Sequence, residues 1–220
     1  MRLKLKFSES KIPFTYPTQN AVNSCIHRIL GENNKYHNSF SNYCVSSLFG
    51  GVIVDNKMTY PNGAHFYVSS LDEELIEKIM FSVINGNVEM CDMKLIGIDI
   101  ENFNLHNDYD IIRTISPILL KDNENIITYQ DSNFIKVLTE KSKIKLLKNG
   151  FSEKDVKTLE IEPFHFEKAR LKFPKVKNVV NKSSQVMLLV RGKKEMRLAL
   201  YKMGLGKSTG CGFGAIEIMK

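Results

Sequence analysis

The sequence predicts an α+β protein built from two tandem ferredoxin-like (RRM-type) domains, with a glycine-rich loop near the C-terminus. Residues 1–104 follow the order β-α-β-β-α-β, and residues 105–220 repeat that order in weaker form. Five glycines fall within residues 204–214. A chain of 220 residues suits either one large domain or two small ones, so the repeated pattern decides in favour of two.

The first domain is expected to open with a strand and a helix. In residues 2–7 the apolar side chains alternate, which is the period of a half-buried strand. Residues 18–31 then place apolar side chains at helical spacing, with Thr18 as the N-cap and Gly31 as the stop.

The rest of the first domain alternates between strand and helix periods. Ser70 and Glu73 form a capping box ahead of an apolar stripe, and Gly86 marks the end of that helix. Turn-forming residues around Asp55 and Gly63 predict a hairpin. Strands are expected over residues 43–49, 64–69 and 93–100.

The boundary is placed in the polar, turn-prone residues 101–109, between an N-terminal domain of residues 1–104 and a C-terminal domain of residues 105–220. Pro117 interrupts the next strand and predicts an edge or a bulge there. The second domain is expected to contain strands over 111–121, 164–177, 185–191 and 212–219, and helices over 133–149, capped by Ser132, and 195–203.

The charge of the chain favours a polyanionic partner. Lys and Arg total 31 against 24 for Asp and Glu, which gives a net charge of +7 and a pI near 9.1. A nucleic acid fits better than a membrane, because no basic amphipathic helix or lipidation signal is present. A basic but merely solvated surface is an equally weighted alternative on charge alone.

The cysteines and the N-terminus indicate a reducing compartment. The four cysteines are scattered without a CxxC pair, which predicts neither a zinc site nor a disulfide framework. The first seven residues alternate like a strand, and no stretch approaches the ~18 apolar residues of a membrane span. The sequence therefore predicts a soluble, cytoplasmic protein without membrane contact.

The densest cationic stretch, residues 168–182, is called here the basic segment. It holds six basic residues and no acidic one. Together with Arg191, Lys193, Lys194 and Arg197 it could form a groove that follows phosphates, and a solvated strand and loop is the alternative. Phe173 and Phe213 are candidates for base stacking, although such residues more often belong to a core. The RNA-binding residues expected in the basic segment are Arg170, Lys172, Lys175, Lys177 and Lys182.

Residues 204–214, GLGKSTGCGFG, are called here the glycine-rich loop. Glycines at this density let the backbone approach a ligand, and successive N–H groups can cradle a phosphate. A nucleotide-binding P-loop is rejected, because Tyr201 stands where that motif needs a glycine. A tight structural turn is the other alternative. The residues expected to bind RNA here are Gly204, Gly206, Lys207, Ser208, Thr209 and Gly210.

This loop, followed by a final strand, resembles the signature of the CRISPR-associated repeat-processing endoribonucleases of the RAMP superfamily. The opening MRLKLKF, the block from Tyr36-His37 to Phe49, and residues 114–118 fit the same resemblance. It implies tandem ferredoxin-like domains, CRISPR repeat RNA (the precursor crRNA) as the substrate, and a product that ends in a 2′,3′-cyclic phosphate. It implies no metal and no cofactor, and it allows CRISPR effector-complex subunits or a homodimer as partners.

Cleavage of RNA through its own 2′-hydroxyl needs a base, an acid and charge stabilisation, and a pair of imidazoles can supply the first two. His27 lies on the polar stripe of its predicted helix, and His37 lies in a turn-prone connection. Family members commonly carry a histidine at the position of His37, and a tyrosine or histidine at that of His27. Ordinary surface or loop histidines are the alternative.

The sequence departs from the family pattern at one position. Some members place a lysine shortly after the loop histidine, where this chain has Asn42-Tyr43. Lys35, Tyr43 or His27 could stabilise the phosphorane instead. The expected catalytic residues are therefore His37, His27 and Tyr43.

Two other functions stay open from the sequence. A non-catalytic RAMP subunit that binds guide RNA in an effector complex would have the same fold and loop. A nucleotide-binding protein that uses residues 204–210 is a third interpretation, which protection by ATP or GTP against heat would support.

Overall fold

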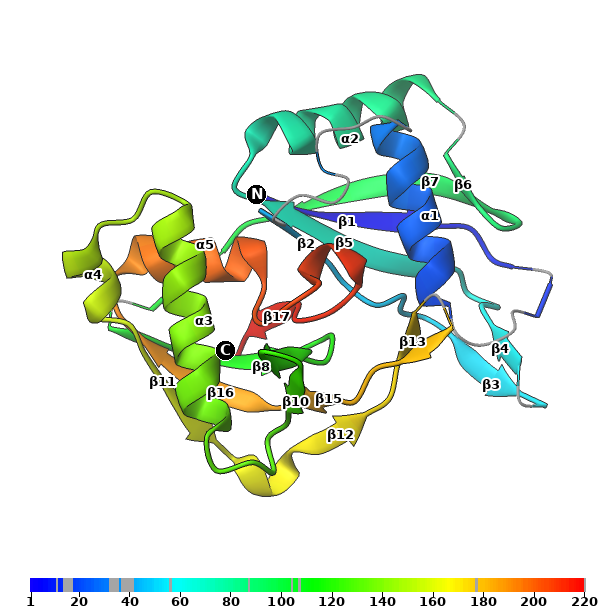
Figure 1. Ribbon diagram of the computed structural model, residues 1–220. Coiled ribbons are helices and arrows are strands. Elements are labelled where there is room, and N and C mark those ends of the chain that lie inside the picture. The colour runs from blue at the N-terminus through cyan, green and yellow to red at the C-terminus, as the bar shows by residue number, and fades with distance from the viewer. Residues whose placement is uncertain are drawn as a thin grey trace.

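The computed structural model describes residues 1–10, 12–13, 18–31, 36, 42–55, 57–86, 88–103, 105–106, 108–176 and 178–219. Within these residues the chain forms two main antiparallel sheets, each of which packs helices against one face (Figure 1), and four two-stranded sheets.

The first sheet has the strand order β2-β5-β1-β7-β6. Its central strand β1 (Arg2–Phe7) lies between β5 (Ala64–Ser70) and β7 (Met93–Glu101). The edge strands are β2 (Tyr43–Val45) and β6 (Glu89–Met90). Helices α1 (Gln19–Leu30) and α2 (Glu73–Asn85) bury their apolar stripes against one face of this sheet, because those stripes recur at helical spacing.

The second sheet has the order β11-β16-β8-β17. Its strands are β8 (Tyr109–Thr114), β11 (Glu160–Phe164), β16 (Met187–Arg191) and β17 (Ile216–Ile218). The helices are α3 (Phe134–Lys148), α4 (Glu153–Lys157) and α5 (Lys194–Met203). Four two-stranded sheets complete the described chain: β3 (Val52–Val54) with β4 (Lys57–Thr59), β9 (Leu120–Asp122) with β10 (Asn125–Ile127), β12 (Arg170–Lys172) with β15 (Ser183–Gln185), and β13 (Lys175–Val176) with β14 (Val179–Val180).

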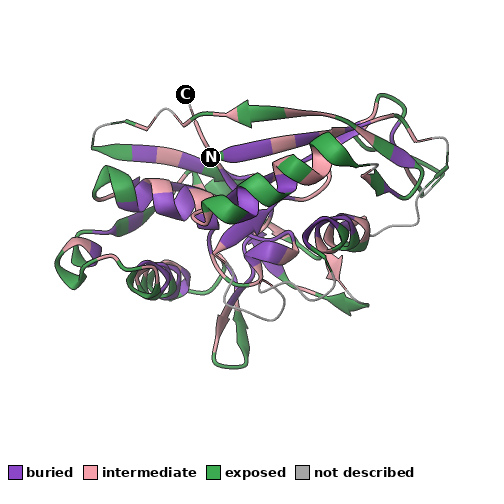
Figure 2. Cartoon of the chain, turned by 90° about the horizontal axis from the view of Figure 1, so that it is seen from above, coloured by how far each residue is buried: buried purple, intermediate pink, exposed green. Residues whose placement is uncertain are grey.

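The two sheets share one topology. Numbered along the chain, the four main strands of each half lie in the spatial order 2-3-1-4, and a helix follows the first and the third strand. This is the ferredoxin-like arrangement, so the predicted fold of two tandem ferredoxin-like units is confirmed. Figure 2 shows the buried residues concentrated in the strands and on the helix surfaces that face them.

Several element boundaries differ from those expected. Asp72 rather than Ser70 is the N-cap of α2; its side chain accepts the Glu74 N–H at 3.0 Å, while Ser70 Oγ accepts the Asp72 N–H at 2.9 Å. Asn133, not Ser132, stands at the N-cap of α3. The strand expected over residues 164–177 is broken by a left-handed His165 and a 3-10 turn, η1 (Phe166–Lys168).

The C-terminal strand is also shorter than predicted, because it begins at Ile216 rather than at residue 212. Gly212 and Gly214 have φ values of 93° and 67°, which lie outside the strand region of the backbone. A 3-10 turn, η2 (Thr209–Cys211), occupies the middle of the glycine-rich loop instead.

Buried polar contacts join the two halves. The guanidinium of Arg2, on β1, donates to the Tyr201 hydroxyl and to the Ile216 carbonyl at 2.7 Å, and lies over the Tyr201 ring. Ser69 Oγ donates to the Lys202 carbonyl at 2.9 Å. These bonds join β1 and β5 of the first half to α5 and β17 of the second. We propose that the domain boundary lies between residues 104 and 105.

Candidate functional site

A cleft of about 1020 Å³ opens between α1 of the first half and α3 of the second, and we call it the α1–α3 cleft. The glycine-rich loop lies between the two helices in Figure 1 and forms the inner wall. The residues that line it come from α1 (Asn20, Asn23, Ser24, His27), from Tyr36 and Tyr43, from β9 and the turn after it (Leu120, Lys121, Asn123), from α3 (Lys141, Ser142, Ile144, Lys145, Lys148) and from the loop (Gly206, Lys207, Ser208, Thr209, Cys211).

His27 and Tyr43, two of the predicted catalytic residues, lie on the first-half wall of this cleft. α1 turns its apolar stripe toward the sheet, which leaves His27 half-buried on the side that lines the cleft. The Tyr36 ring stands edge-on to the Tyr43 ring at 6.1 Å, and its hydroxyl donates to Asp72 at 2.9 Å. His37 lies outside the described residues, and so does Lys35. Tyr36, which precedes His37 in the sequence, lines the cleft.

Tyr43 is held as a neutral phenol. Its side chain is 4% exposed, and this burial raises its pKa to about 12. At neutral pH the hydroxyl therefore keeps its proton and can donate a hydrogen bond, whereas it is a poor general base. A protonated phenol suits the role of hydrogen-bond donor better than that of proton acceptor.

The glycine-rich loop is only partly available to a ligand. Gly206, Lys207, Ser208 and Thr209 line the cleft, whereas Gly204 and Gly210 are buried away from it. An added Cβ would lie 2.6 Å from Cys44 Sγ at Gly204, and 2.7 Å from the Tyr43 ring at Gly210.

Five backbone N–H groups of the glycine-rich loop donate to carbonyls within the protein, among them Gly204 N–H to Leu200 and Cys211 N–H to Ser208, both at 2.8 Å. Leu205 N–H bonds to the Gly214 carbonyl at 2.9 Å, Lys207 N–H to Leu119 at 2.8 Å, and Gly214 N–H to Pro117 at 2.9 Å. The buried glycines thus permit tight packing between the halves. Thr209 is only 1% exposed, so the surface that can face a ligand is limited to residues 206–208 and 211.

We predict that Gly210→Ala lowers the free energy of unfolding by ~1–3 kcal/mol, because the new methyl group overpacks the Tyr43 ring. Chemical denaturation measures this change. Gly97→Ala is the matched control: its nearest neighbour is the flexible Lys6 side chain at 3.3 Å, and neither glycine has a positive φ. Equal stability of Gly210→Ala and the parent protein would contradict the tight contact.

Lysines give the cleft its charge. Lys121, Lys141, Lys145, Lys148 and Lys207 line it, and among the lining residues that the structure describes none is acidic. Lys141 lies 3.7 Å from Asp122, in an exposed and therefore weak ion pair. The positions 141, 145 and 148 share one face of α3, and this helical spacing of lysines was the signal that sequence reasoning missed.

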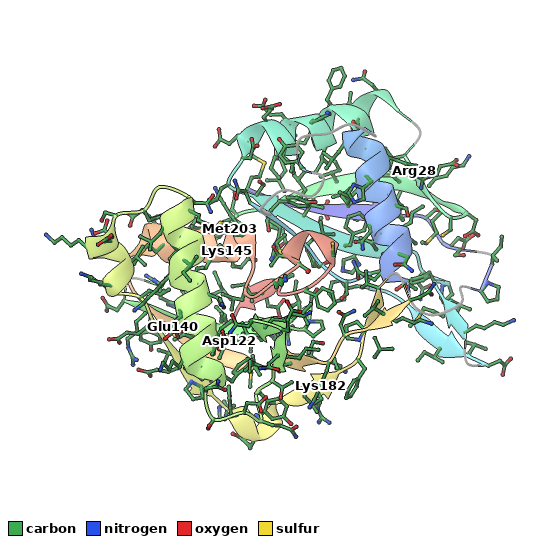
Figure 3. The ribbon with its side chains drawn as sticks, in the orientation of Figure 1. Arg28, Asp122, Glu140, Lys145, Lys182 and Met203 are labelled. Carbon is green, nitrogen blue, oxygen red and sulfur yellow. The ribbon has the colours of Figure 1, made fainter. Side chains whose placement is uncertain are left out.

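The basic segment lies outside the cleft lining. Arg170, Lys172 and Lys182 are exposed, Lys175 is half-buried on β13, and Lys177 lies outside the described residues. The segment runs from the second half toward the base of α1 (Figure 1), and Lys182 lies beside β12 and β15 (Figure 3).

The predicted cationic groove included Arg197, and the structure contradicts this. Arg197 is 3% exposed and forms a buried ion pair with Asp110, so it belongs to the interior. Arg191 and Lys193 form surface ion pairs with Glu162 and Asp155. Phe213 is a core residue, whereas Phe173 is 56% exposed.

In the part of the chain that the structure describes, no group of three His, Cys, Asp or Glu side chains could hold a metal ion. None of the helices described is both long enough and apolar enough to cross a membrane.

Comparison with known families gives one match. The model of the family described as "CRISPR associated protein Cas6, C-terminal" matches residues 100–218, which is more than half of the chain. No curated protein matches the sequence.

Solved structures resemble the whole chain. A structure described as "CRISPR associated protein Cas6" is 22% identical with a TM-score of 0.79, and the match covers 100% of this chain and 99% of that one. A Cas6-related protein from Pyrococcus furiosus is 21% identical, with a TM-score of 0.81 and coverage of 100% and 98%. A RAMP protein described as binding different RNA substrates is 19% identical, with a TM-score of 0.83 and full coverage of both chains. At these identities the likeness establishes the fold.

Proposed function

This chain belongs to the family of the CRISPR associated protein Cas6, and from that premise we propose that it binds CRISPR repeat RNA in the cytoplasm and cuts the precursor transcript into guide RNAs. The observation that carries the proposal is the α1–α3 cleft, which joins His27 and Tyr43 to the exposed part of the glycine-rich loop within a wall of lysines. Such a lining attracts a phosphate backbone and offers proton-transfer groups beside it.

The proposed reaction uses the RNA as its own nucleophile. One imidazole removes the 2′-hydroxyl proton, and the 2′-oxygen attacks the adjacent phosphorus. The bond from phosphorus to the 5′-oxygen breaks, and the second imidazole protonates that leaving oxygen. The products are a 2′,3′-cyclic phosphate and a 5′-hydroxyl. We assign the two imidazoles to His27 and His37, and no step requires a metal ion.

The charge of the phosphorane needs donors that are in place before the reaction. Tyr43 carries its proton at neutral pH and lines the same cleft as His27. Lys207 lies on the exposed part of the glycine-rich loop. In this proposal Tyr43 and Lys207 take the place of the lysine that some family members carry shortly after the loop histidine.

The test is cleavage of the cognate repeat RNA in EDTA, with the termini of both fragments identified by sequencing. We expect one defined cut, a 2′,3′-cyclic phosphate and an unchanged rate when magnesium is restored. Binding without cleavage would instead support the non-catalytic RAMP subunit. The molar mass of the free protein, measured by light scattering, tests the proposed homodimer. The same measurement on a mixture with effector-complex subunits tests those partners.

Salt dependence tests which surfaces follow the RNA backbone. We expect Lys121→Glu with Lys207→Glu to weaken binding and to reduce the slope of log affinity against log salt by ~0.7 for each phosphate that the protein no longer neutralises. Charge reversal of Lys175 and Lys177 in the basic segment is expected to act in the same direction. The measurement is filter binding from low to high salt.

The control for these reversals is Lys154→Glu on α4, which is exposed and lies outside the cleft lining. An unchanged slope in the Lys121 and Lys207 double variant would show that the RNA does not follow the cleft. A reduced slope in the Lys175 and Lys177 variant alone would assign the RNA path to the basic segment.

A further inference from the structure

Lys145 is a buried lysine on the cleft side of α3. It is 7% exposed, and its ammonium donates to the carbonyls of Met203 at 3.0 Å and Gly204 at 3.1 Å, and to Thr209 Oγ1 at 3.4 Å. Figure 3 shows Lys145 next to Met203, where α5 ends and the glycine-rich loop begins. An ammonium group has three N–H donors, so these three acceptors use all of them.

Burial of a charged amine is costly, and the chain meets this cost with a specific environment. Burial lowers the pKa of Lys145 to about 8. Met203 is the last residue of α5 and Gly204 its C-cap, and the carbonyls at a helix C-terminus carry partial negative charge without partners inside the helix. Lys145 therefore satisfies the end of α5 at the point from which the loop departs.

Thr209 extends this contact into the first half of the chain. While its Oγ1 accepts from Lys145, the Thr209 hydroxyl donates to the Tyr43 carbonyl at 2.9 Å. Gly210, the next residue, lies against the Tyr43 ring. A continuous set of bonds thus runs from Lys145 on α3, through the loop, to the tyrosine on the opposite wall of the cleft.

We infer that Lys145 is a positioning residue, which holds the exposed part of the glycine-rich loop in register with Tyr43 and His27 without contacting the RNA itself. This inference deepens the proposed function and rests on it. If the loop shifts, Lys207 and Ser208 move relative to Tyr43, and the donors no longer converge on one phosphate. Loss of the Lys145 ammonium should then slow the chemical step more than it weakens binding.

The first arm of the test compares Lys145→Met with Lys143→Met. Methionine keeps the length and the apolar stem of the lysine but removes its donors, and Lys143 is a lysine of the same helix outside the cleft lining. We expect Lys145→Met to lower the single-turnover rate at saturating RNA by about tenfold or more, because small misplacements of reacting groups have such effects. The RNA dissociation constant is expected to change less than about twofold for both variants, on the scale of one surface interaction.

The second arm uses Thr209. Thr209→Val keeps the shape but breaks the link between Lys145 and the Tyr43 carbonyl, whereas Thr209→Ser keeps the hydroxyl. We expect the valine variant to lose rate and the serine variant to retain it. In the double variant of Lys145→Met with Thr209→Val the losses should be less than additive, because both changes break one link. If Lys145→Met does not fold, the comparison of Thr209→Val with Thr209→Ser tests the inference instead.

Weakened binding in Lys145→Met with a smaller salt slope and a normal saturated rate would make Lys145 a phosphate ligand and overturn the inference. So would equal rate losses in the Lys143 and Lys145 variants, or a Thr209→Val variant as active as Thr209→Ser. A parent protein that does not cut repeat RNA refutes the proposed function instead. Hydrogen exchange of residues 204–211 in the free protein then decides: faster exchange in Lys145→Met supports the positioning role, and unchanged exchange removes it.

Discussion

A repeat RNA with a 2′-deoxy nucleotide at the scissile position alone is expected to bind with normal affinity and to remain uncut. The deoxy sugar lacks the attacking oxygen, while the phosphates and bases that provide binding stay in place. The loss should reach the detection limit of a single-turnover assay, because no other group in the proposed reaction can replace the nucleophile. The measurement pairs that assay with a binding titration of the same RNA.

The matched control is an RNA with the deoxy substitution one nucleotide downstream, which should be cut at the normal rate. Cleavage of the scissile-deoxy RNA at the same bond would mean that water attacks the phosphorus, and the assignment of two imidazoles to transfer of the 2′-hydroxyl proton would then be abandoned. If the scissile-deoxy RNA stays intact and the control RNA is cut normally, the result supports attack by the 2′-hydroxyl of the RNA itself.

The sequence specifies the order of elements well, because each main element carries its own period. Leu3, Leu5 and Phe7 alternate and are buried, and the stripe of α2 at Leu75, Ile76 and Ile79 faces the sheet. The βαββαβ order then selects the topology. The sequence predicts one long strand where the second half has short hairpins, since the breaks depend on single residues such as the left-handed His165.

The sequence predicts those residues of the candidate site whose exposure follows from the local pattern of polar and apolar side chains. His27 is off the apolar stripe of α1, and it does line the cleft. The division of the glycine-rich loop into buried and exposed parts was not predictable, because it depends on residues far away in the sequence. Gln19 occupies the space beside Gly212, and Tyr43 that beside Gly210.

The burial of Lys145 was likewise not predictable from the local sequence. A lysine on a helix of mixed polarity is normally a solvated residue. Its role depends on where α5 ends, and hence on how two helices that are far apart in the chain pack together. Tertiary contacts of this kind are absent from a local pattern.

His37→Ala is expected to lower the cleavage rate by ~10²–10⁴-fold, the contribution of one general acid or base, while RNA affinity stays nearly constant. A group that transfers a proton during the reaction stabilises the transition state more than it stabilises the bound substrate. His27→Ala should behave likewise if the second imidazole is the partner. The measurement is single-turnover cleavage at saturating RNA, alongside the dissociation constant for an uncleavable deoxy repeat.

The control is His165→Asn. His165 is an exposed residue with a left-handed backbone, a conformation that asparagine tolerates, and its ring pairs with Glu167 outside the cleft. That variant should cut normally. Added imidazole should restore part of the activity of His37→Ala if the missing group transferred protons. Equal loss of binding and cutting in His37→Ala would make His37 a residue that places the RNA, and the second proton-transfer group would have to be sought among the other residues of the α1–α3 cleft.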